Sequence, residues 1–271
     1  MSLPVLILDL DGTIIGDITY LAISHNLRLL FKKQNIKSNN INLAKLYSEK
    51  TNIIRPFFTK FIKHIQNSIP NILIYIYTAS EKNWALKEIG WIEKECNIKF
   101  QRPIFHRDFC ILKNGTYLKS VAKIFPKIKL KHRNISIDNF LIIDNNKIFL
   151  DAKNILICPH YNYQFFIDIW SIVPKSAIKN TIIYSFLINY IKVNYINPCS
   201  SHILNIHGKE DLKSRYHEWF VKKYKELDKN NSIYKTDVFW KELSILLQQN
   251  YVTNFYDNNF KSFKSQIQKL S

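Results

Sequence analysis

The chain has 271 residues, of which 46% are hydrophobic and 14% aromatic, a content that supplies a packed core and excludes wholesale disorder. The formal net charge is +18, from 39 Lys and Arg against 21 Asp and Glu. Such a charge favours anionic partners, either phosphorylated protein or nucleic acid. An AT-rich coding sequence, which enriches Lys, Asn and Ile, explains the charge equally well.

Cysteine usage and hydropathy indicate where the protein works. The four cysteines are scattered without a CxxC pair (Cys96, Cys110, Cys158 and Cys199). The first apolar run, Leu3–Leu8, is too short for a signal peptide and leads directly into Asp9. The apolar stretch Thr181–Ile196 is interrupted by polar residues, so we expect a buried helix and no membrane partner. We expect a reducing, intracellular setting, cytoplasmic or nuclear, or host cytoplasm for a viral protein.

Strands and helices alternate in the first half of the chain. Strands are predicted from apolar runs at Leu3–Leu8, Ile72–Tyr77, Phe140–Ile143 and Asn154–Ile157. Helices are predicted at Tyr20–Phe31, Pro56–Ile65 and Glu81–Glu95. A short hairpin is predicted around Asn114-Gly115, and the basic run at residues 127–133 is interpreted as a solvated loop. This order predicts a Rossmann-like, three-layer α/β core with a mainly parallel sheet at residues 1–174, carrying a helical insert at 16–54.

The second half shows only helical patterns. They cover Ala177–Val193, Asp211–Leu227, Tyr234–Gln249 and Phe255–Leu270. We therefore predict an α-helical extension at residues 175–271. No oligomeric state is predicted.

The strongest chemical signal is the run Asp9-Leu10-Asp11-Gly12-Thr13, directly after the first strand. Open α/β sheets bind ligands at the carboxyl ends of their strands, so both carboxylates are expected to reach one site. One can act as nucleophile and the other as acid and base. Because adjacent carboxylates repel each other, a cation is the natural compensator, and oxygen ligands suit Mg²⁺.

Three later signals lie at equivalent positions. Thr78 follows the second apolar strand, and its hydroxyl can donate to a phosphoryl oxygen. Lys119 follows the hairpin, where it can neutralise charge on a phosphoryl group. Asp144-Asn145 follows the third strand and can complete a metal shell. A zinc site could also be formed by Cys158-Pro159-His160 with Cys199-Ser200-Ser201-His202, but their spacing fits no familiar zinc pattern well.

In this combination the chain resembles the haloacid dehalogenase superfamily of phosphatases. It is most similar to the Fcp/Scp-like, or NLI-interacting-factor-like, phosphatases of C-terminal domains. Apart from the motifs above, the resemblance rests on Arg55-Pro56, Trp84-Ala85, Arg107-Asp108-Phe109-Cys110 and Tyr117-Leu118-Lys119-Ser120. It covers roughly residues 3–172. Two departures stand out, because Gly12 occupies a position where this branch usually has Glu, and Asn146 replaces a usual Ser-Pro.

The resemblance implies a role for each matching residue. Asp9 would form an aspartyl-phosphate, and Asp11 would protonate the leaving oxygen and then activate water, while Thr78 and Lys119 hold the phosphoryl group. The remaining implied roles are substrate contact by Thr13, Ser80, Trp84 and Arg107, and Mg²⁺ binding by Asp9, Asp11, Asp144 and Asn145.

The implied function is a Mg²⁺-dependent phosphoric monoester hydrolase that acts on phosphoserine or phosphothreonine in proteins. Two alternatives stay open at this point. One is a nucleotide or polynucleotide phosphatase, since the positive charge suits nucleic acid as well. The other is a binding or scaffold protein that keeps the fold without turnover.

Overall fold

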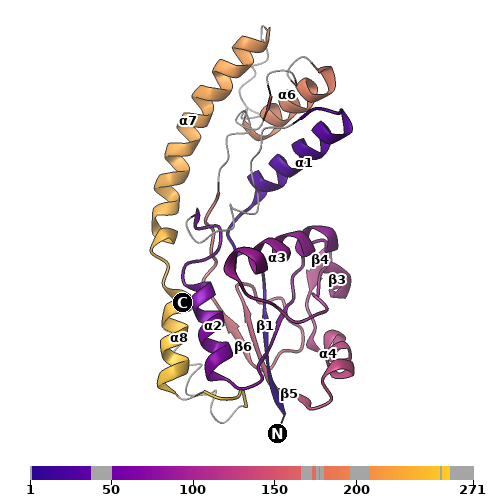
Figure 1. Ribbon diagram of the computed structural model, residues 1–271, viewed down its shortest axis with the longest axis vertical. Helices are drawn as coiled ribbons and strands as arrows, with labels where there is room; N and C mark the ends of the chain where they lie inside the picture. Colours follow the sequence, from indigo (N-terminus) through magenta and orange to yellow (C-terminus); the bar gives the residue numbers. More distant parts are fainter. Residues whose placement is uncertain are drawn as a thin grey trace. The chain divides into compact units, whose positions relative to one another are not determined.

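The computed structural model describes residues 2–37, 51–165, 173–174, 177, 180–195, 208–250 and 252–256. Its contacts divide the chain into two compact units, whose elements are labelled in Figure 1. The first unit comprises Met1–Asp17, Ala44–Tyr163 and Ile233–Ser271, and the second comprises Ile18–Leu43 and Gln164–Ser232. Residues 18–43 of the predicted insert thus group with residues 164–232, whereas the end of the predicted extension groups with the core.

A parallel sheet forms the centre of the first unit. Its strands are β1 (Leu3–Leu8), β2 (Leu73–Ile76), β5 (Ile135–Asp144) and β6 (Ile155–Ile157), in the order β2-β1-β5-β6. β1 pairs in parallel with both β2 and β5, and β6 extends the sheet from β5. Val5 to Leu8 are fully buried, as expected of a central strand covered on both faces. The predicted α/β class with a mainly parallel sheet and C-terminal helices is confirmed.

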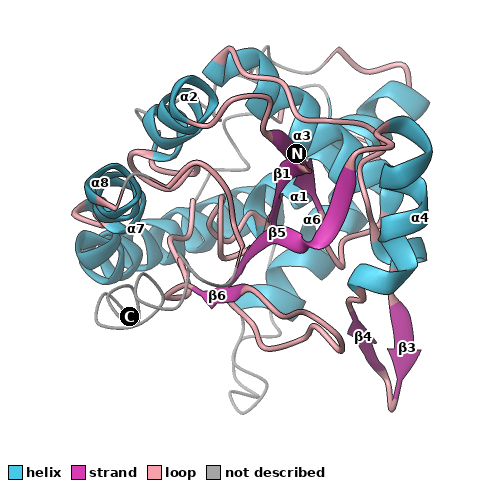
Figure 2. Ribbon diagram, turned by 90° about the horizontal axis from the view of Figure 1, so that it is seen from below, coloured by secondary structure: helices cyan, strands magenta, loops and turns pink. Residues whose placement is uncertain are grey.

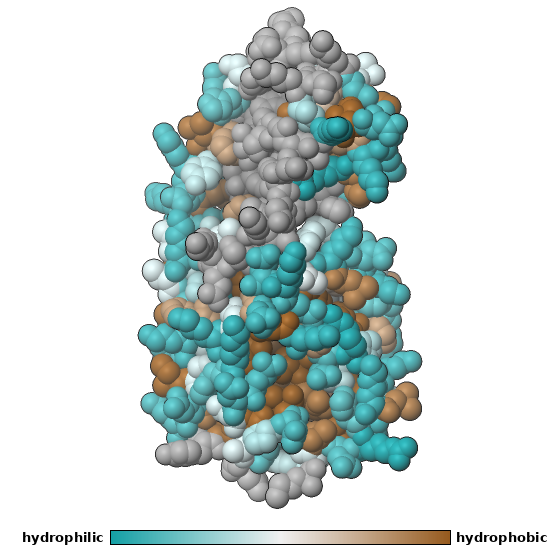
Figure 3. All heavy atoms as spheres, in the orientation of Figure 1, coloured by the Kyte–Doolittle hydropathy of each residue, from teal (hydrophilic) through white to brown (hydrophobic). Residues whose placement is uncertain are grey.

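Helices cover both faces of this sheet. Figure 2 shows the strands between α4 (Val121–Lys131) and the neighbouring pair α2 (Phe58–Ser68) and α8 (Phe239–Gln249). Ile124 and Ile128 of α4 join Val5, Ile7 and Tyr75 in one buried cluster. On the view in Figure 3, this unit shows hydrophobic residues as a central strip bordered by hydrophilic ones. The sheet is therefore held by apolar burial on both faces, which leaves its strand ends free to carry polar groups.

A hairpin and α4 lie between β2 and β5 along the chain. β3 (Ile111–Lys113) and β4 (Thr116–Leu118) pair antiparallel, and both turn residues, Asn114 and Gly115, have positive φ. This confirms the predicted hairpin. The interpretation of residues 127–133 as a loop was wrong for most of the run, because α4 continues to Lys131. Pro126 lies inside this helix, and an interior proline argues against a helix in the sequence. The first turn of the helix is capped by the side chains of Ser120 and Asp151.

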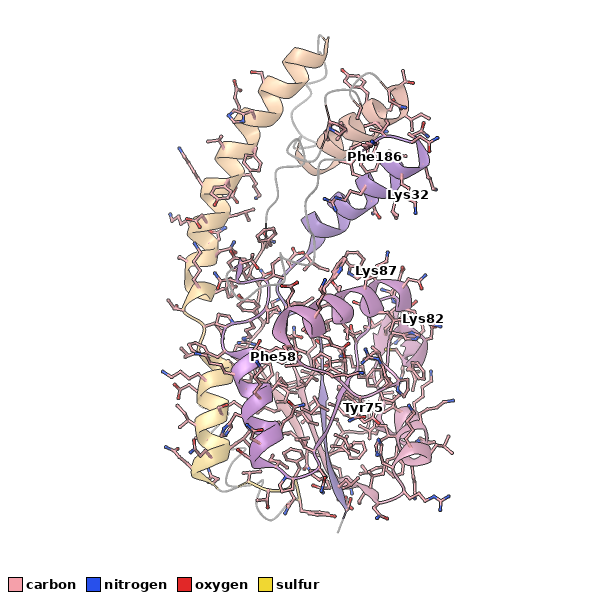
Figure 4. All side chains as sticks on the ribbon, viewed as in Figure 1. Lys32, Phe58, Tyr75, Lys82, Lys87 and Phe186 are labelled. Carbon is pink, nitrogen blue, oxygen red and sulfur yellow. The ribbon has the colours of Figure 1, made fainter. Side chains whose placement is uncertain are left out.

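The second unit is helical where the structure describes it. It contains α1 (Thr19–Lys33), α6 (Thr181–Tyr195) and most of α7 (Gly208–Lys235). α1 packs against α6, where Lys32 and Phe186, labelled in Figure 4, line a shallow pocket of about 560 Å³. Among the helices that are described, none combines the length and hydropathy needed to cross a bilayer. The predicted helix at Phe255–Leu270 lies almost entirely outside the described residues.

A buried ion pair within the first unit joins the segment after α7 to the segment before α2. Arg55, which is 1% exposed, donates two hydrogen bonds of 2.9 and 2.8 Å to the carboxylate of Asp237. It also donates to the carbonyl oxygen of Pro159 at 2.9 Å, and its guanidinium lies 4.5 Å from the ring centre of Phe239. Asp237 in turn accepts from the backbone N–H of Phe239, so the same carboxylate starts α8 later than the predicted Tyr234.

Asp237→Asn should lower the free energy of unfolding by about 3–5 kcal/mol, because it leaves the Arg55 guanidinium buried without its counter-charge. Urea titration of the purified chain measures this effect. The matched control is Glu226→Gln, which breaks the exposed Lys223–Glu226 pair and should cost at most about 1 kcal/mol. Equal losses in the two variants would show that the buried Arg55–Asp237 pair contributes no more to the free energy of unfolding than an exposed ion pair.

Candidate functional site

The polar residues that follow the strands of the sheet meet at one edge. Asp9 follows β1, Thr78 follows β2, and Asp144 is the last residue of β5. Because β2 and β5 flank β1 in parallel, their carboxyl ends lie side by side. Lys119 reaches the same place from the segment between β4 and α4. The structure therefore brings together the four stretches of chain on which the predicted site depends.

Lys119 links two of the carboxylates. Its Nζ lies 2.5 Å from Asp9 Oδ1 and 2.7 Å from Asp144 Oδ2, and its side chain is fully buried. The rings of Tyr77 and Phe149 enclose the ammonium group at 5.8 and 5.6 Å from their centres. The lysine thus carries a fixed positive charge at the floor of the site, in a place that water does not reach.

The charges at this point do not balance. The pKa of Asp9 is raised to about 7, because burial and the negative charges of Asp144 and Asp11 together outweigh the opposing effect of Lys119. Burial alone would lower the pKa of Lys119, but Asp9 and Asp144 outweigh it and raise that pKa above the usual value. One ammonium group therefore faces an excess of carboxylates, and an additional cation would favour the ionised form of Asp9.

Asp11 is held by the loop after β2. Its Oδ2 accepts hydrogen bonds from Ser80 Oγ at 2.6 Å and from Thr78 Oγ1 at 3.2 Å. Thr78 Oγ1 also accepts from the backbone N–H of Ser80, which closes a tight turn. In this structure both hydroxyls thus position Asp11, and the predicted contact of Thr78 with a phosphoryl oxygen stays a prediction.

Thr13 and Asn145 form the wall opposite the lysine. Thr13 Oγ1 lies 3.3 Å from Asp9 Oδ2 and accepts from the backbone N–H of Asn145 at 3.1 Å. One end of the Asn145 amide lies 3.0 Å from the carbonyl oxygen of Asp11 and 3.1 Å from Asp9 Oδ2. Thr13 therefore fits a positioning role for Asp9, and its predicted substrate contact stays a prediction.

The donor atoms next to Asp9 fit a small divalent cation. Oxygen ligands at adjacent corners of an octahedral Mg²⁺ shell lie about 3 Å apart, and one end of the Asn145 amide lies at about this distance from both Asp9 Oδ2 and the Asp11 carbonyl oxygen. Asp144 accepts hydrogen bonds from Lys119 and from the backbone N–H of Asn146, and its predicted role in Mg²⁺ binding stays a prediction. In the part of the chain that is described, no three carboxylate, imidazole or thiol side chains cluster as a metal site.

Two predicted substrate residues lie beside the loop after β2. Arg107 donates to the carbonyl oxygen of Ala79 at 2.8 Å and to Glu81 at 3.1 Å, and its guanidinium lies over the ring of Tyr117. It therefore braces the loop that carries Thr78 and Ser80. Trp84 lies on α3 (Lys82–Cys96) with its ring centre 6.3 Å from that of Trp91. Substrate contact by either residue stays a prediction.

Sequence reasoning missed the loop after β6 as part of the site. His160 lies 2.5 Å from the Asn145 amide, and the buried Cys158 places its Sγ 3.7 Å from Thr13 Oγ1. The signal was available, because both residues directly follow the predicted strand Asn154–Ile157. Their spacing does not match a zinc site, whereas their position after a strand of the parallel sheet does predict a place near the site.

Comparison with known proteins identifies a family. The NLI interacting factor-like phosphatase family matches residues 4–168, which is more than half of the chain. No curated protein matches the sequence significantly.

Two solved structures of Fcp1 are similar to this chain. One is fission yeast Fcp1, an RNA polymerase II CTD phosphatase, in a form bound to beryllium fluoride, with 16% identity and a TM-score of 0.37. The other is Fcp1 described as an essential RNA polymerase II CTD phosphatase, with 17% identity and a TM-score of 0.35. The matches cover 99% of this chain but 62% and 70% of those chains. From the family match, the chain belongs to the NLI interacting factor-like phosphatases, and the resemblance to haloacid dehalogenase-type phosphatases is confirmed.

Proposed function

We propose that this site hydrolyses phosphate monoesters through an aspartyl-phosphate on Asp9, with Mg²⁺ as cofactor. The observation that carries the proposal is the buried Asp9 carboxylate held 2.5 Å from Lys119 Nζ, with the hydrogen-bonded carboxylate of Asp11 two residues away. A nucleophile, a proton donor and a fixed positive charge are what phosphoryl transfer requires of a protein.

The reaction proceeds in two steps. In the first, an Asp9 oxygen attacks phosphorus, the bond from phosphorus to the ester oxygen breaks, and Asp11 gives its proton to that leaving oxygen. In the second, water attacks phosphorus while the Asp11 carboxylate takes its proton, and the bond to Asp9 breaks to release phosphate. Ser80 and Thr78 keep the Asp11 carboxyl in one orientation for both proton transfers.

Positive charge at the site serves the same steps. Lys119 neutralises negative charge on the transferring group without reorganisation, because its ammonium is already fixed in a buried setting. Asp9, the Asp11 carbonyl oxygen and Asn145 are the residues that would hold Mg²⁺. When bound, the cation supplies charge stabilisation for the phosphoryl oxygens.

We further propose phosphoserine or phosphothreonine protein segments as substrates. Family membership supports this class, and the similar solved structures are of Fcp1, a phosphatase of the RNA polymerase II CTD. The helix that follows the loop of Thr78 and Ser80 adds an electrostatic argument, since Lys82 and Lys87 are exposed on α3 (Figure 4). Lysines at this place would attract an anionic peptide to the entrance of the site.

The test compares substrates and metal conditions. The purified chain is assayed for phosphate release from an aryl phosphate, from serine- and threonine-phosphorylated peptides, and from 5′- and 3′-phosphorylated oligonucleotides. We expect turnover with Mg²⁺, its loss with EDTA, and its return on adding Mg²⁺, because Asp9 must be ionised to attack.

The outcomes separate the alternatives. A higher kcat/KM for the phosphopeptides supports the protein substrate, whereas a higher value for the oligonucleotides would favour a polynucleotide phosphatase. Absence of turnover on all substrates, together with tight phosphopeptide binding, would indicate a scaffold protein and overturn the proposal. Activity that is unchanged in EDTA would refute the metal requirement.

A further inference from the structure

One imidazole at the rim of the site is not used by the proposed reaction. His160 follows β6 and is exposed to solvent, with its Nδ1 lying 2.5 Å from one end of the Asn145 amide. The backbone N–H of the next residue, Tyr161, donates to the carbonyl oxygen of Gly12 at 2.8 Å. The loop that carries His160 is therefore tied to the loop that carries Asp9 and Asp11.

His160 fits against Gly12 without space between them. A Cβ at position 12 would lie 2.6 Å from both Cε1 and Nδ1 of the imidazole, which is too close for any real contact. Gly12 also has a φ of +74°, a conformation that disfavours other residues. The ring thus occupies the space that a side chain at position 12 would need. His160 can hold this position only because residue 12 is glycine.

The orientation of Asn145 decides what the site can bind. Its other amide end faces Asp9 Oδ2 and the Asp11 carbonyl at 3.1 and 3.0 Å. An amide NH₂ at that end would hydrogen-bond to these oxygens in the cation-free protein. An amide oxygen there would add a third ligand oxygen to the other two. Because the amide has one oxygen and one nitrogen, the oxygen faces the cation position only when the nitrogen faces His160.

We propose that His160 is a positioning residue for Asn145. In the tautomer that carries its hydrogen on Nε2, the ring accepts an N–H of the Asn145 amide at Nδ1 and leaves the amide oxygen directed at Asp9 and Asp11. Partners of this kind orient metal ligands and raise metal affinity. The inference rests on the proposed divalent-cation site, and it concerns only how this chain prepares that site.

The experiment measures cation binding directly. Mn²⁺ is titrated into the full chain and free Mn²⁺ is followed by electron paramagnetic resonance, without substrate. His160→Ala should weaken Mn²⁺ binding by about 10–100-fold. His160→Asn should retain most of the affinity, because its side-chain oxygen can accept at the place of Nδ1. His64→Ala, which removes a histidine on α2, serves as the control and should leave the affinity unchanged.

Two further readouts separate positioning from folding and from chemistry. The free energy of unfolding of His160→Ala should equal that of the wild type, since the side chain is exposed. Its kcat at saturating Mn²⁺ should return to near the wild-type value, because His160 acts only through the amide. Wild-type affinity in His160→Ala, or affinity in His160→Asn as weak as in His160→Ala, would overturn the inference alone. A wild-type chain that neither binds Mn²⁺ nor hydrolyses phosphate esters would overturn the proposed function and this inference together.

Discussion

Asp9→Asn should reduce phosphatase turnover by at least about 1,000-fold, because the amide has no anionic oxygen with which to attack phosphorus. The substitution preserves shape, and Thr13 and Lys119 keep their places around the side chain. The measurement is kcat on an aryl phosphate with saturating Mg²⁺. In parallel, a radiolabelled substrate should transfer phosphate to the wild-type chain but not to the variant.

A stability measurement makes this result specific. Asp9 carries a buried charge that its surroundings disfavour, as its raised pKa of about 7 shows. Its neutral replacement should therefore not lower the free energy of unfolding at pH 8, since Lys119 keeps Asp144 as a partner. Asp138→Asn, on the same strand as Asp144 but exposed, should leave both turnover and stability nearly unchanged. Turnover within tenfold of wild type in Asp9→Asn would exclude Asp9 as the nucleophile.

The sequence was sufficient for the core of the site because parallel strands impose their own geometry. Once Leu3–Leu8, Ile72–Tyr77 and Phe140–Ile143 are assigned as strands of one sheet, Asp9, Thr78 and Asp144 must lie along one edge. Strand assignment was reliable here because β1 is buried on both faces and so appears as a continuous apolar run.

What the sequence could not show are contacts that depend on tertiary position. Arg55 and Asp237 are 182 residues apart, and no local pattern links them. The spacing of Thr78 and Ser80 places both near a ligand, but only the folded loop shows that their hydroxyls bind Asp11. α4 was missed because Pro126 lies inside it, where a proline normally argues against a helix. The carboxylate of Asp151, which caps the first turn of α4, comes from a distant part of the chain. Long-range hydrogen bonds thus determine which side chains contact one another in the site, while hydrophobic burial determines the order of strands and helices.

Lys119→Met should have two separable effects, one on catalysis and one on folding. Methionine keeps the length of the side chain but removes the ammonium that faces the phosphoryl group, so kcat should fall by about 100–1,000-fold. It also leaves Asp9 and Asp144 buried without their shared counter-charge, which should lower the free energy of unfolding by about 3–5 kcal/mol. Lys123→Met is the matched control, because Lys123 is an exposed lysine in the first turn of α4, the helix that follows Lys119.

The pH dependence identifies the cause of both losses. Lys119 lowers the pKa of Asp9, so its removal must raise that pKa above about 7. As the pH is lowered, the residual activity of Lys119→Met should therefore begin to fall at a higher pH than the activity of the wild type, because the nucleophile acts only when ionised. A carboxyl with a raised pKa in the folded state loses its contribution to stability as the pH rises through that pKa. The stability deficit of the variant should accordingly widen above pH 7.

A double variant tests whether charge or packing is responsible. If the uncompensated carboxylates cause the loss, Lys119→Met combined with Asp9→Asn should recover part of the unfolding free energy while staying inactive. Recovery would show that Lys119 compensates Asp9 electrostatically. If the double variant is instead as unstable as the sum of its single variants, the lysine contributes through its packing against Tyr77 and Phe149, and its assignment as the fixed charge of the site would be wrong.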